Sequence, residues 1–501
     1  MTEARAIYAA ADLGAESGRV ILGHLGEETL TLKEVHRFPN VPVGLPDGIH
    51  WNLLTLFEQI RRGLESAVSG HGRLDGIGID AWGVDYGLLD GDHRLLGVPY
   101  HYRDARTDGM IELADRRLAP EARYARTGIQ RMPINTVFQL LSERDSPALA
   151  AAERIALIPD LLGLWLSGEL VNESTIASTT GLLDARTGGW ARDTAEALGL
   201  PGRIFSGPTV EPGTALGTVR DGVEGLGGLP VWNVAAHDTA SAFVAAPLSS
   251  PRAAILSSGT WSLLGVEVDA PVLDGAALAA NLTNERGLGG AIRLLRNVMG
   301  LWLVQECRRR WSEQGLDLDY AELGRLAGDA GEADPLFDPD HPDLLHRGDM
   351  PTRIARLCAA AGQPAPADPG QVVRSILLSL ACKYRVVLRR LERVSGRSFD
   401  VIHVIGGGAR NRVLCQLTAD VTGLPVVAGP VEATALGNIL VQAQAAGQLG
   451  SLRQMRDLVT VTCALERFEP SADGRAAAVF ERFLAVTGLS PALPEPTLVR
   501  T

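Results

Sequence analysis

Two segments in different halves of this chain share one local design. Residues 6–25 (AIYAAADLGAESGRVILGHL) and 253–273 (AAILSSGTWSLLGVEVDAPVL) each place a turn of glycine and small polar residues between two apolar runs. This pattern predicts a strand, a tight turn and a second strand. Because 501 residues exceed one ordinary core, we predict a duplicated architecture in which the two turns face each other.

Strand-like and helix-like segments alternate along the rest of the chain. A helix is predicted over residues 52–69, and mostly helical structure over 106–205. Residues 229–246 (LPVWNVAAHDTASAFVAA) predict a strand followed by a helix of small residues. Residues 399–449 repeat strand and helix twice. This alternation is typical of layered α/β structure, which is the predicted fold class.

A turn-forming segment divides the chain. Residues 247–252 (PLSSPR) directly precede the second hairpin. We therefore predict one domain over residues 1–247 and a second over 248–450, followed by a C-terminal helix and tail over 451–501.

The charge balance limits the partners to be expected. The formal net charge is -12, which argues against a nucleic-acid or acidic-membrane surface. Only two lysines occur, Lys33 and Lys383, and neither lies beside a glycine turn. A lysine-dependent phosphate site is therefore not expected, although backbone amides and a bound cation can still hold phosphate groups.

The cysteines and the apolar segments indicate a cellular compartment. The five cysteines form no C-x-x-C pair and are odd in number, which favours reduced thiols. The N-terminal residues lack the apolar core of a signal peptide, and no apolar run reaches the roughly 20 residues that cross a bilayer. We expect a soluble cytoplasmic protein, with its oligomeric state left open.

Three glycine-containing turns are candidates for phosphate binding. They are DLGAESGR (residues 12–19), SSGTWS (257–262) and VIGGGARN (404–411). Glycines allow close approach of a ligand to backbone amides, and Asp12 is suited to hold a metal through water. Ordinary turns explain the same residues, and neither G-x-G-x-x-G nor a Walker A sequence is present.

Two further segments combine aromatic and charged residues. IDAWGVDYG contains Trp82 beside Asp80, Gly83 and Asp85, and such a group suits a polyol, with the ring on apolar faces and carboxylates on hydroxyls. A core tryptophan with surface aspartates explains it equally well. The second segment, YRDART (residues 102–107), is explained by a salt bridge within a charged loop.

The segment VAAHDTASAF places His237 and Asp238 among small and apolar residues. An aspartate stays ionised at neutral pH unless strongly desolvated, so Asp238 can serve as a general base. On composition alone, the structural roles are favoured: Asp238 as the N-cap of a helix and His237 as a hydrogen-bonded core residue.

The segment LLRNVMGLWLVQEC predicts a helix. Its apolar positions share one face at helical spacing and indicate a core stripe. Asn297 and Gln305 are then polar residues at the edge of this stripe, where they can face a cleft.

Taken together and in order, these motifs resemble the FGGY carbohydrate kinase family. The resemblance spans residues 8–445 and is most specific in three segments, AHDTAS, SSGTWSL and GPVEATALGN. It implies two actin/hexokinase-like (ribonuclease H-like) α/β domains around a central cleft. It also implies ATP-dependent phosphorylation of L-rhamnulose at its 1-hydroxyl, with Mg²⁺.

The resemblance also assigns roles to individual residues. Asp238 is implied as the general base. Asp12, from its place just before the first turn, is the candidate to hold Mg²⁺ through water. The implied ATP contacts are Ala15, Glu16, Ser17, Gly18, Arg19, Thr260, Gln305, Gly407 and Gly408. The implied sugar contacts are Gly83, His237, Asp238, Thr239 and Asn297. Glu16 departs from the family pattern, which often has serine at this position. A carboxylate beside phosphates is unfavourable unless it points outward or toward Mg²⁺, so Glu16 is the weakest of the implied ATP contacts.

Several other functions are compatible with these motifs. A kinase for another ketose, such as L-fuculose or xylulose, has the same motifs with a different pocket shape. An actin- or chaperone-like ATPase shares the architecture, but it predicts an appended peptide-binding domain that the short segment after residue 450 does not offer. An inactive sugar-binding homologue would have lost Asp238 or the phosphate turns, and both are present.

Overall fold

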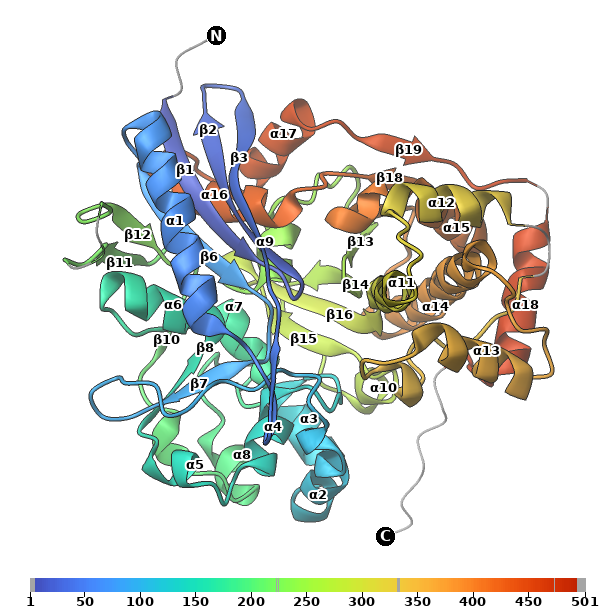
Figure 1. Cartoon of the computed structure of the whole chain (residues 1–501), viewed down its shortest axis with the longest axis horizontal. Helices are drawn as coiled ribbons and strands as arrows, with labels where there is room; N and C mark the ends of the chain where they lie inside the picture. The colour runs from blue at the N-terminus through green and yellow to red at the C-terminus, as the bar shows by residue number, and fades with distance from the viewer. Residues whose placement is uncertain (1–4, 222, 224, 331–333, 473, 493–501) are drawn as a thin grey trace.

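The chain folds into two lobes, each built on one large β-sheet (Figure 1). The computed structural model describes residues 5–221, 223, 225–330, 334–472 and 474–492. The first sheet has six strands and the second has seven. This arrangement confirms the predicted α/β fold class.

The first sheet has the strand order β11-β12-β6-β1-β2-β3. Strands β1 and β2 form the predicted first hairpin, and β6 and β12 run parallel to β1. Its strands are β1 (Ala6–Leu13), β2 (Ser17–Leu25), β3 (Leu30–Pro39), β6 (Gly76–Ala81), β11 (Ala215–Thr218) and β12 (Pro230–Trp232).

The second sheet has the order β15-β16-β14-β13-β17-β18-β19. Its strands are β13 (Ala253–Ser258), β14 (Trp261–Val268), β15 (Thr283–Arg286), β16 (Ile292–Met299), β17 (Val401–Ile405), β18 (Val426–Ala428) and β19 (Glu466–Phe468). Read from β19 to β16, successive neighbours pair antiparallel, parallel, parallel, antiparallel and antiparallel. The first sheet has the same order from β11 to β3. The duplicated architecture is therefore present strand for strand, with β15 as an extra edge strand.

Two helices connect the sheets through a shared apolar core. Helices α9 (Asp238–Val244) and α16 (Ala433–Ala445) cross between them (Figure 1), and this core contains apolar residues of both sheets. The helices approach closely at Gly437, where a Cβ atom would lie 1.7 Å from the carbonyl oxygen of Ser241. The small residues of AHDTAS and ATALGN therefore allow this contact.

The outer faces of the sheets carry longer helices. Helix α1 (Leu53–His71) covers β2 and β3, begins after the N-cap Asn52 and ends at Gly72. Helices α14 (Pro369–Ser395) and α15 (Arg412–Thr422) cover the second sheet. The remaining long helices of this lobe are α11 (Trp302–Glu313), α12 (Tyr320–Asp329), α13 (Met350–Ala360), α17 (Leu452–Thr462) and α18 (Arg475–Thr487).

Residues between β6 and β11 form a cap on the first lobe. Its part over residues 106–205 is mostly helical, as predicted, although short strands interrupt it. Two further elements, β4 (Val43–Leu45) and β5 (Gly48–His50), form a small hairpin after β3. The helices of the cap are α2 (Met110–Arg117), α3 (Pro120–Thr127), α4 (Thr136–Ser142), α5 (Pro147–Ala151), α6 (Ile158–Ser167), α7 (Ser174–Ala177) and α8 (Arg192–Ala197). Its strands are β7 (Tyr86–Leu89), β8 (Arg154–Leu157), β9 (Asn172–Glu173) and β10 (Thr209–Val210).

The prediction of one helix through LLRNVMGLWLVQEC is wrong for its first half. Asn297 lies in strand β16, paired with Leu263 of β14, and α11 begins only at Trp302. The backbone turns at Gly300, where a Cβ atom would meet the backbone of Trp261 at 2.6 Å. Tertiary packing against the second hairpin therefore overrides the helical spacing.

The segment after residue 450 contains more structure than a helix and a tail. Helix α17 packs near α9 and β3, β19 completes the edge of the second sheet, and α18 packs against α14 and α15. Within the described ranges, none of the helices is long and apolar enough to cross a bilayer.

Candidate active site

One cavity of about 310 Å³ lies between the lobes, and both hairpin turns line it. Its wall also includes the turn after β6, the start of α9, the end of β16 and the glycine turn after β17. The predicted site residues that line the cavity are Asp12, Ala15, Glu16, Ser17, Arg19, Gly83, His237, Asp238, Thr239, Thr260, Asn297, Gln305 and Gly407. Residues distant in sequence therefore meet at one place.

Two predicted ATP contacts, Gly18 and Gly408, lie outside the cavity wall. A Cβ atom on Gly18 would meet the ring of Phe38 at 2.3 Å, and one on Gly408 would meet Ser258 Oγ at 2.0 Å. Both glycines therefore allow close packing beneath the turns.

Asp238 is the first residue of α9 and lines the cavity. Within the described structure, only one of its two carboxylate oxygens accepts hydrogen bonds. Its Oδ1 accepts hydrogen bonds from the backbone N–H of Thr239 at 2.5 Å and from Thr239 Oγ1 at 3.1 Å. Its Oδ2 accepts none from the residues that the structure describes. Burial, and secondarily repulsion from Asp12, raise the pKa of Asp238, whereas His237 lowers it. The expected N-cap role is wrong, because His237 occupies that position.

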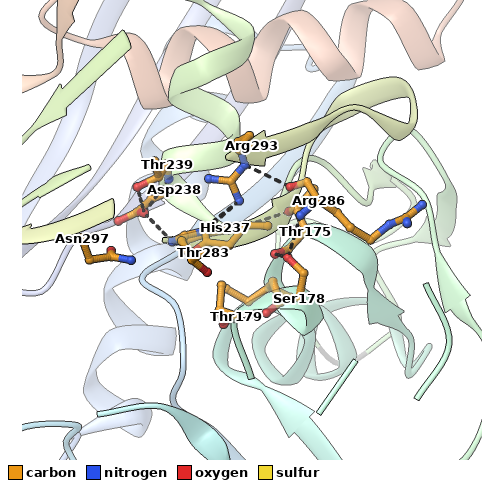
Figure 2. Close-up of polar contacts among 12 residues, drawn as sticks. Thr175, Ser178, Thr179, His237, Asp238, Thr239, Thr283, Arg286, Arg293 and Asn297 are labelled. Carbon is orange, nitrogen blue, oxygen red and sulfur yellow. Dashed lines mark hydrogen bonds and ion pairs between the residues drawn. The ribbon is translucent and has the colours of Figure 1, made fainter. Parts of the chain in front are cut away.

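His237 is buried and also lines the cavity, so the two interpretations of this residue are compatible. Its backbone N–H donates to Thr175 Oγ1 at 3.2 Å and its backbone forms a bridge with Ala81 at the end of β6. Figure 2 shows its ring between Asp238 and Arg293. The ring Nε2 lies 3.4 Å from Asp238 Oδ1.

Asp12 at the end of β1 is held by Arg19, which donates to Asp12 Oδ2 from Nε at 2.9 Å and from a terminal nitrogen at 2.7 Å. Arg19 also pairs with Glu432, the residue before α16, so this contact joins the lobes. Asp80 lies opposite Asp12 in the parallel β1–β6 pair. Burial, and then repulsion from Asp12, raise the pKa of Asp80, while a hydrogen bond from Asn438 lowers it.

Glu16 occupies an exposed part of the cavity wall. The surrounding protein desolvates its carboxyl group, and Glu306 repels the charge, so the pKa of Glu16 is raised to about 7. Arg347, Arg308 and Arg103 act in the opposite direction. Near neutral pH this carboxyl is therefore partly protonated, which reduces its repulsion of a phosphate group.

The second turn places Thr260 beside Gln305. The Gln305 side-chain nitrogen donates to Thr260 Oγ1 at 3.3 Å. Gln305 Oε1 is buried without a hydrogen-bond partner among the described residues. The glycine turn after β17 lies beside this hairpin, because β13 and β17 are parallel neighbours. An unpartnered amide oxygen on a cavity wall suits a ligand that brings its own donor.

The turn after β6 is organised by Asp85, which is fully buried. Asp85 Oδ2 accepts hydrogen bonds from Trp51 Nε1 at 2.6 Å and Trp82 Nε1 at 2.9 Å, and Oδ1 accepts one from Gln139 at 2.8 Å. Burial raises the pKa of Asp85 to about 6. The alternative interpretation of this segment, a core tryptophan with surface aspartates, is therefore wrong for the aspartates: Asp80 and Asp85 are both 0% exposed.

The backbone is strained at Val84, next to the predicted sugar contact Gly83, and side chains of the cap hold it in place. Val84, which follows Gly83, has a φ of +70°, a conformation that costs of order 1–3 kcal/mol for a β-branched residue. Its backbone N–H donates to Thr179 Oγ1 at 3.1 Å, and its carbonyl oxygen accepts from Thr136 Oγ1 at 2.6 Å.

Arg103 crosses from the first lobe to the second, so the expected loop salt bridge is wrong for it. Its side chain is buried, donates to the carbonyl oxygen of Leu345 at 2.7 Å and lies 3.9 Å from the centroid of the Trp302 ring. Within the described ranges, no carboxylate forms an ion pair with it.

Sequence reasoning did not assign roles to three residues of the site. Gln130 contacts Asn297, and Glu285 and Arg293 contact His237. All three are buried. Gln130 and Glu285 lie in the segments GIQRMPINTVFQL (residues 128–140) and NLTNERG (281–287), but a single sequence does not reveal their partners.

Two equivalent sheets face one cavity, and each contributes a glycine-containing turn to it. Between the turns, Asp238 Oδ2 accepts no hydrogen bond from the described residues. This is the two-lobed actin/hexokinase-like fold, and matches to two family models make the protein a phosphotransferase. The family model of the N-terminal domain of FGGY carbohydrate kinases matches residues 7–245, and that of the C-terminal domain matches residues 254–446. The chain belongs to the FGGY family of carbohydrate kinases, which confirms the resemblance.

Similar proteins include two bacterial enzymes named rhamnulokinase. That of Bacteroides thetaiotaomicron is 42% identical, covering 92% of this chain and 96% of its own. That of Pectobacterium carotovorum is 42% identical, covering 95% and 96%. Among solved structures, glycerol kinase of Plasmodium falciparum with ADP has a TM-score of 0.75 at 15% identity, over 97% of this chain and 98% of that one. Xylulose kinase of Lactobacillus acidophilus has a TM-score of 0.76 at 14% identity, over 96% and 97%.

Proposed function

We propose that this carbohydrate kinase transfers a phosphoryl group from ATP to the 1-hydroxyl of L-rhamnulose, giving L-rhamnulose 1-phosphate. The substrate proposal is supported by the rhamnulokinases that are 42% identical over nearly their full length. The free Oδ2 of Asp238, facing the cavity between two phosphate-type turns, is the observation that carries the chemistry.

In this proposal Asp238 is the general base. The two Thr239 donors orient Oδ1, so Oδ2 is available to accept the proton of the sugar hydroxyl. Burial raises the pKa of Asp238, which makes its carboxylate a stronger base for the sugar hydroxyl. Proton transfer in phosphoryl transfer can be late, because the leaving group departs before attack is complete.

The sugar contacts come from both lobes. Gly83, His237, Thr239 and Asn297 surround the carboxylate in the same cavity, and we propose that they orient the sugar hydroxyl toward ATP. Residues 15–19, Thr260, Gln305 and the Gly407–Gly408 turn are the proposed ATP contacts. Gly18 and Gly408 would contribute through backbone groups or packing, since they lie outside the cavity wall.

The site also fits Mg²⁺. Among the described residues, no three His, Cys, Asp or Glu side chains lie close enough to hold a metal by themselves. Mg²⁺ typically binds one or two carboxylates together with substrate phosphates and water. Asp12 would hold it through water, because its Oδ1 receives no hydrogen bond from the described residues. When bound, Mg²⁺ neutralises phosphate charge.

A coupled ADP-release assay tests the substrate. We expect L-rhamnulose to stimulate ADP release well above the rate in water, and more than L-fuculose or xylulose does. Stimulation by another ketose but not by L-rhamnulose would overturn the substrate assignment. ATP hydrolysis that no sugar stimulates would favour an ATPase.

The variant Asp238→Asn tests the base. It keeps the shape of the side chain and removes its basicity, so sugar phosphorylation should fall by at least the 10²–10⁴-fold typical of general-base loss. ATP binding, measured by calorimetry, should stay near that of the wild type. Wild-type turnover in this variant would remove Asp238 from the mechanism.

We further propose that the enzyme acts in the cytoplasm. All five cysteines lie in the described part of the chain and are free thiols there, as suits a reducing compartment. Cell fractionation with an antibody against the chain tests this location.

A further inference from the structure

Arg293 of β16 is fully buried, 0% exposed, and its guanidinium group faces His237 (Figure 2). One terminal nitrogen lies 3.1 Å from His237 Nδ1 and 3.1 Å from Glu285 Oε2. Its Nε donates to the carbonyl oxygen of Arg286 at 3.0 Å. Glu285 and Arg293 are also direct partners in the antiparallel β15–β16 pair. The guanidinium group is therefore held from two sides.

These contacts determine which ring nitrogen of His237 carries the proton. A guanidinium group has donors and no acceptor, so a hydrogen bond with Nδ1 requires Nδ1 to accept. In a neutral imidazole the proton is then on Nε2. Nε2 faces the cavity side of the ring, 3.4 Å from Asp238 Oδ1. The Nε2–H group therefore lies beside the carboxylate.

The Arg293 guanidinium group also opposes the alternative tautomer, in which His237 Nδ1 carries the proton. Glu285 Oε2 lies 3.4 Å from His237 Nδ1 and would accept a proton held there. That proton would face the Arg293 N–H, which is closer, at 3.1 Å. Two donors directed at each other in a buried site are unfavourable. Glu285 instead compensates the buried charge of Arg293.

We infer that Arg293, held by Glu285, is a positioning residue that fixes His237 as the Nε2–H tautomer beside Asp238. His237 belongs to the first lobe, whereas Glu285 and Arg293 belong to the second. The second lobe therefore sets the donor next to the base, and this arrangement depends on the lobes being assembled as they are. The kinetic consequence rests on the proposed function of Asp238 and His237.

The tautomer is measured directly in the sugar-free enzyme. In protein labelled with ¹⁵N-histidine, long-range ¹H–¹⁵N spectra distinguish protonated from unprotonated ring nitrogens, and His237→Asn identifies the signals. We expect the wild type to carry the proton on Nε2. Arg293→Met should move it partly or fully to Nδ1, whereas Arg293→Lys, which keeps a donor, should retain Nε2–H. A wild-type proton on Nδ1, or unchanged signals in Arg293→Met, overturns the inference.

A matched control lies on the same strand. Arg296 is also buried and ion-paired, but its partner is Asp340, away from His237. Arg296→Met should lower thermal stability as any loss of a buried arginine does, and leave the His237 nitrogen signals unchanged. A change in those signals equal to that of Arg293→Met would show a general effect of losing a buried charge.

Kinetics separate positioning from structure. Arg293→Met should lower kcat for the sugar about 100-fold, the scale of a misplaced catalytic group, with the KM for ATP unchanged. In an His237→Asn background the same change should cost no more, because Arg293 acts through His237. Fully multiplicative losses would overturn the inference. Failure of the wild type to phosphorylate L-rhamnulose would refute only the proposed function, since the tautomer measurement needs no substrate.

Discussion

Gln130 takes the place of a missing strand beside Asn297. Its Oε1 accepts the backbone N–H of Asn297 at 2.8 Å, and its Nε2 donates to the Asn297 carbonyl oxygen at 3.0 Å. Strand β15 begins at Thr283, opposite Leu295, so it does not reach the outer edge of Asn297. A side chain of the cap therefore completes the ladder of the second sheet and joins the two lobes at the cavity.

Gln130→Leu should weaken sugar binding selectively. The change leaves two backbone groups of Asn297 without partners, at a cost of about 1–3 kcal/mol for each group that stays buried. We expect the KM for the sugar to rise about tenfold or more, with the KM for ATP within about twofold of the wild type. Steady-state kinetics with each substrate varied in turn measures both.

A close structural match provides the control. Gln363, which lies outside the cavity wall, holds the backbone of Leu336 in the same way. Its Oε1 accepts the Leu336 N–H at 2.9 Å, and its Nε2 donates to the Leu336 carbonyl oxygen at 2.7 Å. Gln363→Leu should lower stability without changing either KM. Equal effects of the two variants on the sugar KM would contradict the role of Gln130.

Glu16 should make ATP binding depend on pH. Its pKa of about 7 means that it becomes charged as the pH rises through neutrality, and the ionised form repels phosphate. We expect the wild-type KM for ATP to rise relative to that of Glu16→Gln between about pH 6 and pH 8. ATP titrates in the same range, so the ratio of the two enzymes, rather than either alone, is the quantity to follow. A constant ratio would contradict the prediction.

Asp238 should set the acidic limb of turnover. Its pKa is raised, chiefly by burial, and the base acts only when ionised. As the pH falls, kcat should therefore decline at a higher pH than the ordinary aspartate value of about 3.9 predicts. A profile of kcat against pH under saturating substrates measures this. A limb at or below the ordinary value would contradict a partly buried carboxylate that acts as the base.

Asp85 should lower stability as it ionises. The unfolded chain loses this proton near pH 4, but the folded chain holds it to about pH 6. Its contribution to the free energy of unfolding is therefore fully present below about pH 4 and lost as the pH rises to about 6, by about 3 kcal/mol. Urea unfolding should show Asp85→Asn closer to the wild type at pH 7 than at pH 4 by about this amount. A pH-independent difference between the two proteins would refute it.

Gly437→Ala should separate α16 from α9 and displace Asp238. The added methyl group meets the Ser241 carbonyl oxygen at 1.7 Å, and overpacking of this kind typically costs 1–3 kcal/mol. We expect a lower melting temperature and reduced kcat. The control Gly324→Ala, in helix α12 with open space around the site, should raise stability by up to about 1 kcal/mol. Two variants that both stabilise would contradict the close helix contact.

Local patterns predicted the features that depend on neighbouring residues in the chain. The apolar runs around DLGAESGR and SSGTWS predicted both hairpins, and the small residues of AHDTAS predicted the short helix that begins at Asp238. Helical spacing failed at Asn297, because the packing of Gly300 against the second hairpin keeps that segment in a strand. The motif order also carried the family resemblance, which the two domain matches confirm.

The sequence by itself therefore determined the strand-turn-strand repeats, the α/β class and the residue types available at the turns, because those follow from periodicity and backbone preference. Only the tertiary structure decided that Asp80 and Asp85 are buried, that Gln130 supports Asn297 and that Arg293 faces His237. Each of these pairs joins residues distant in the chain. Their contact depends on how two lobes close on one cavity, and the pKa of a carboxyl or the tautomer of a ring depends on the groups that this closure places around it.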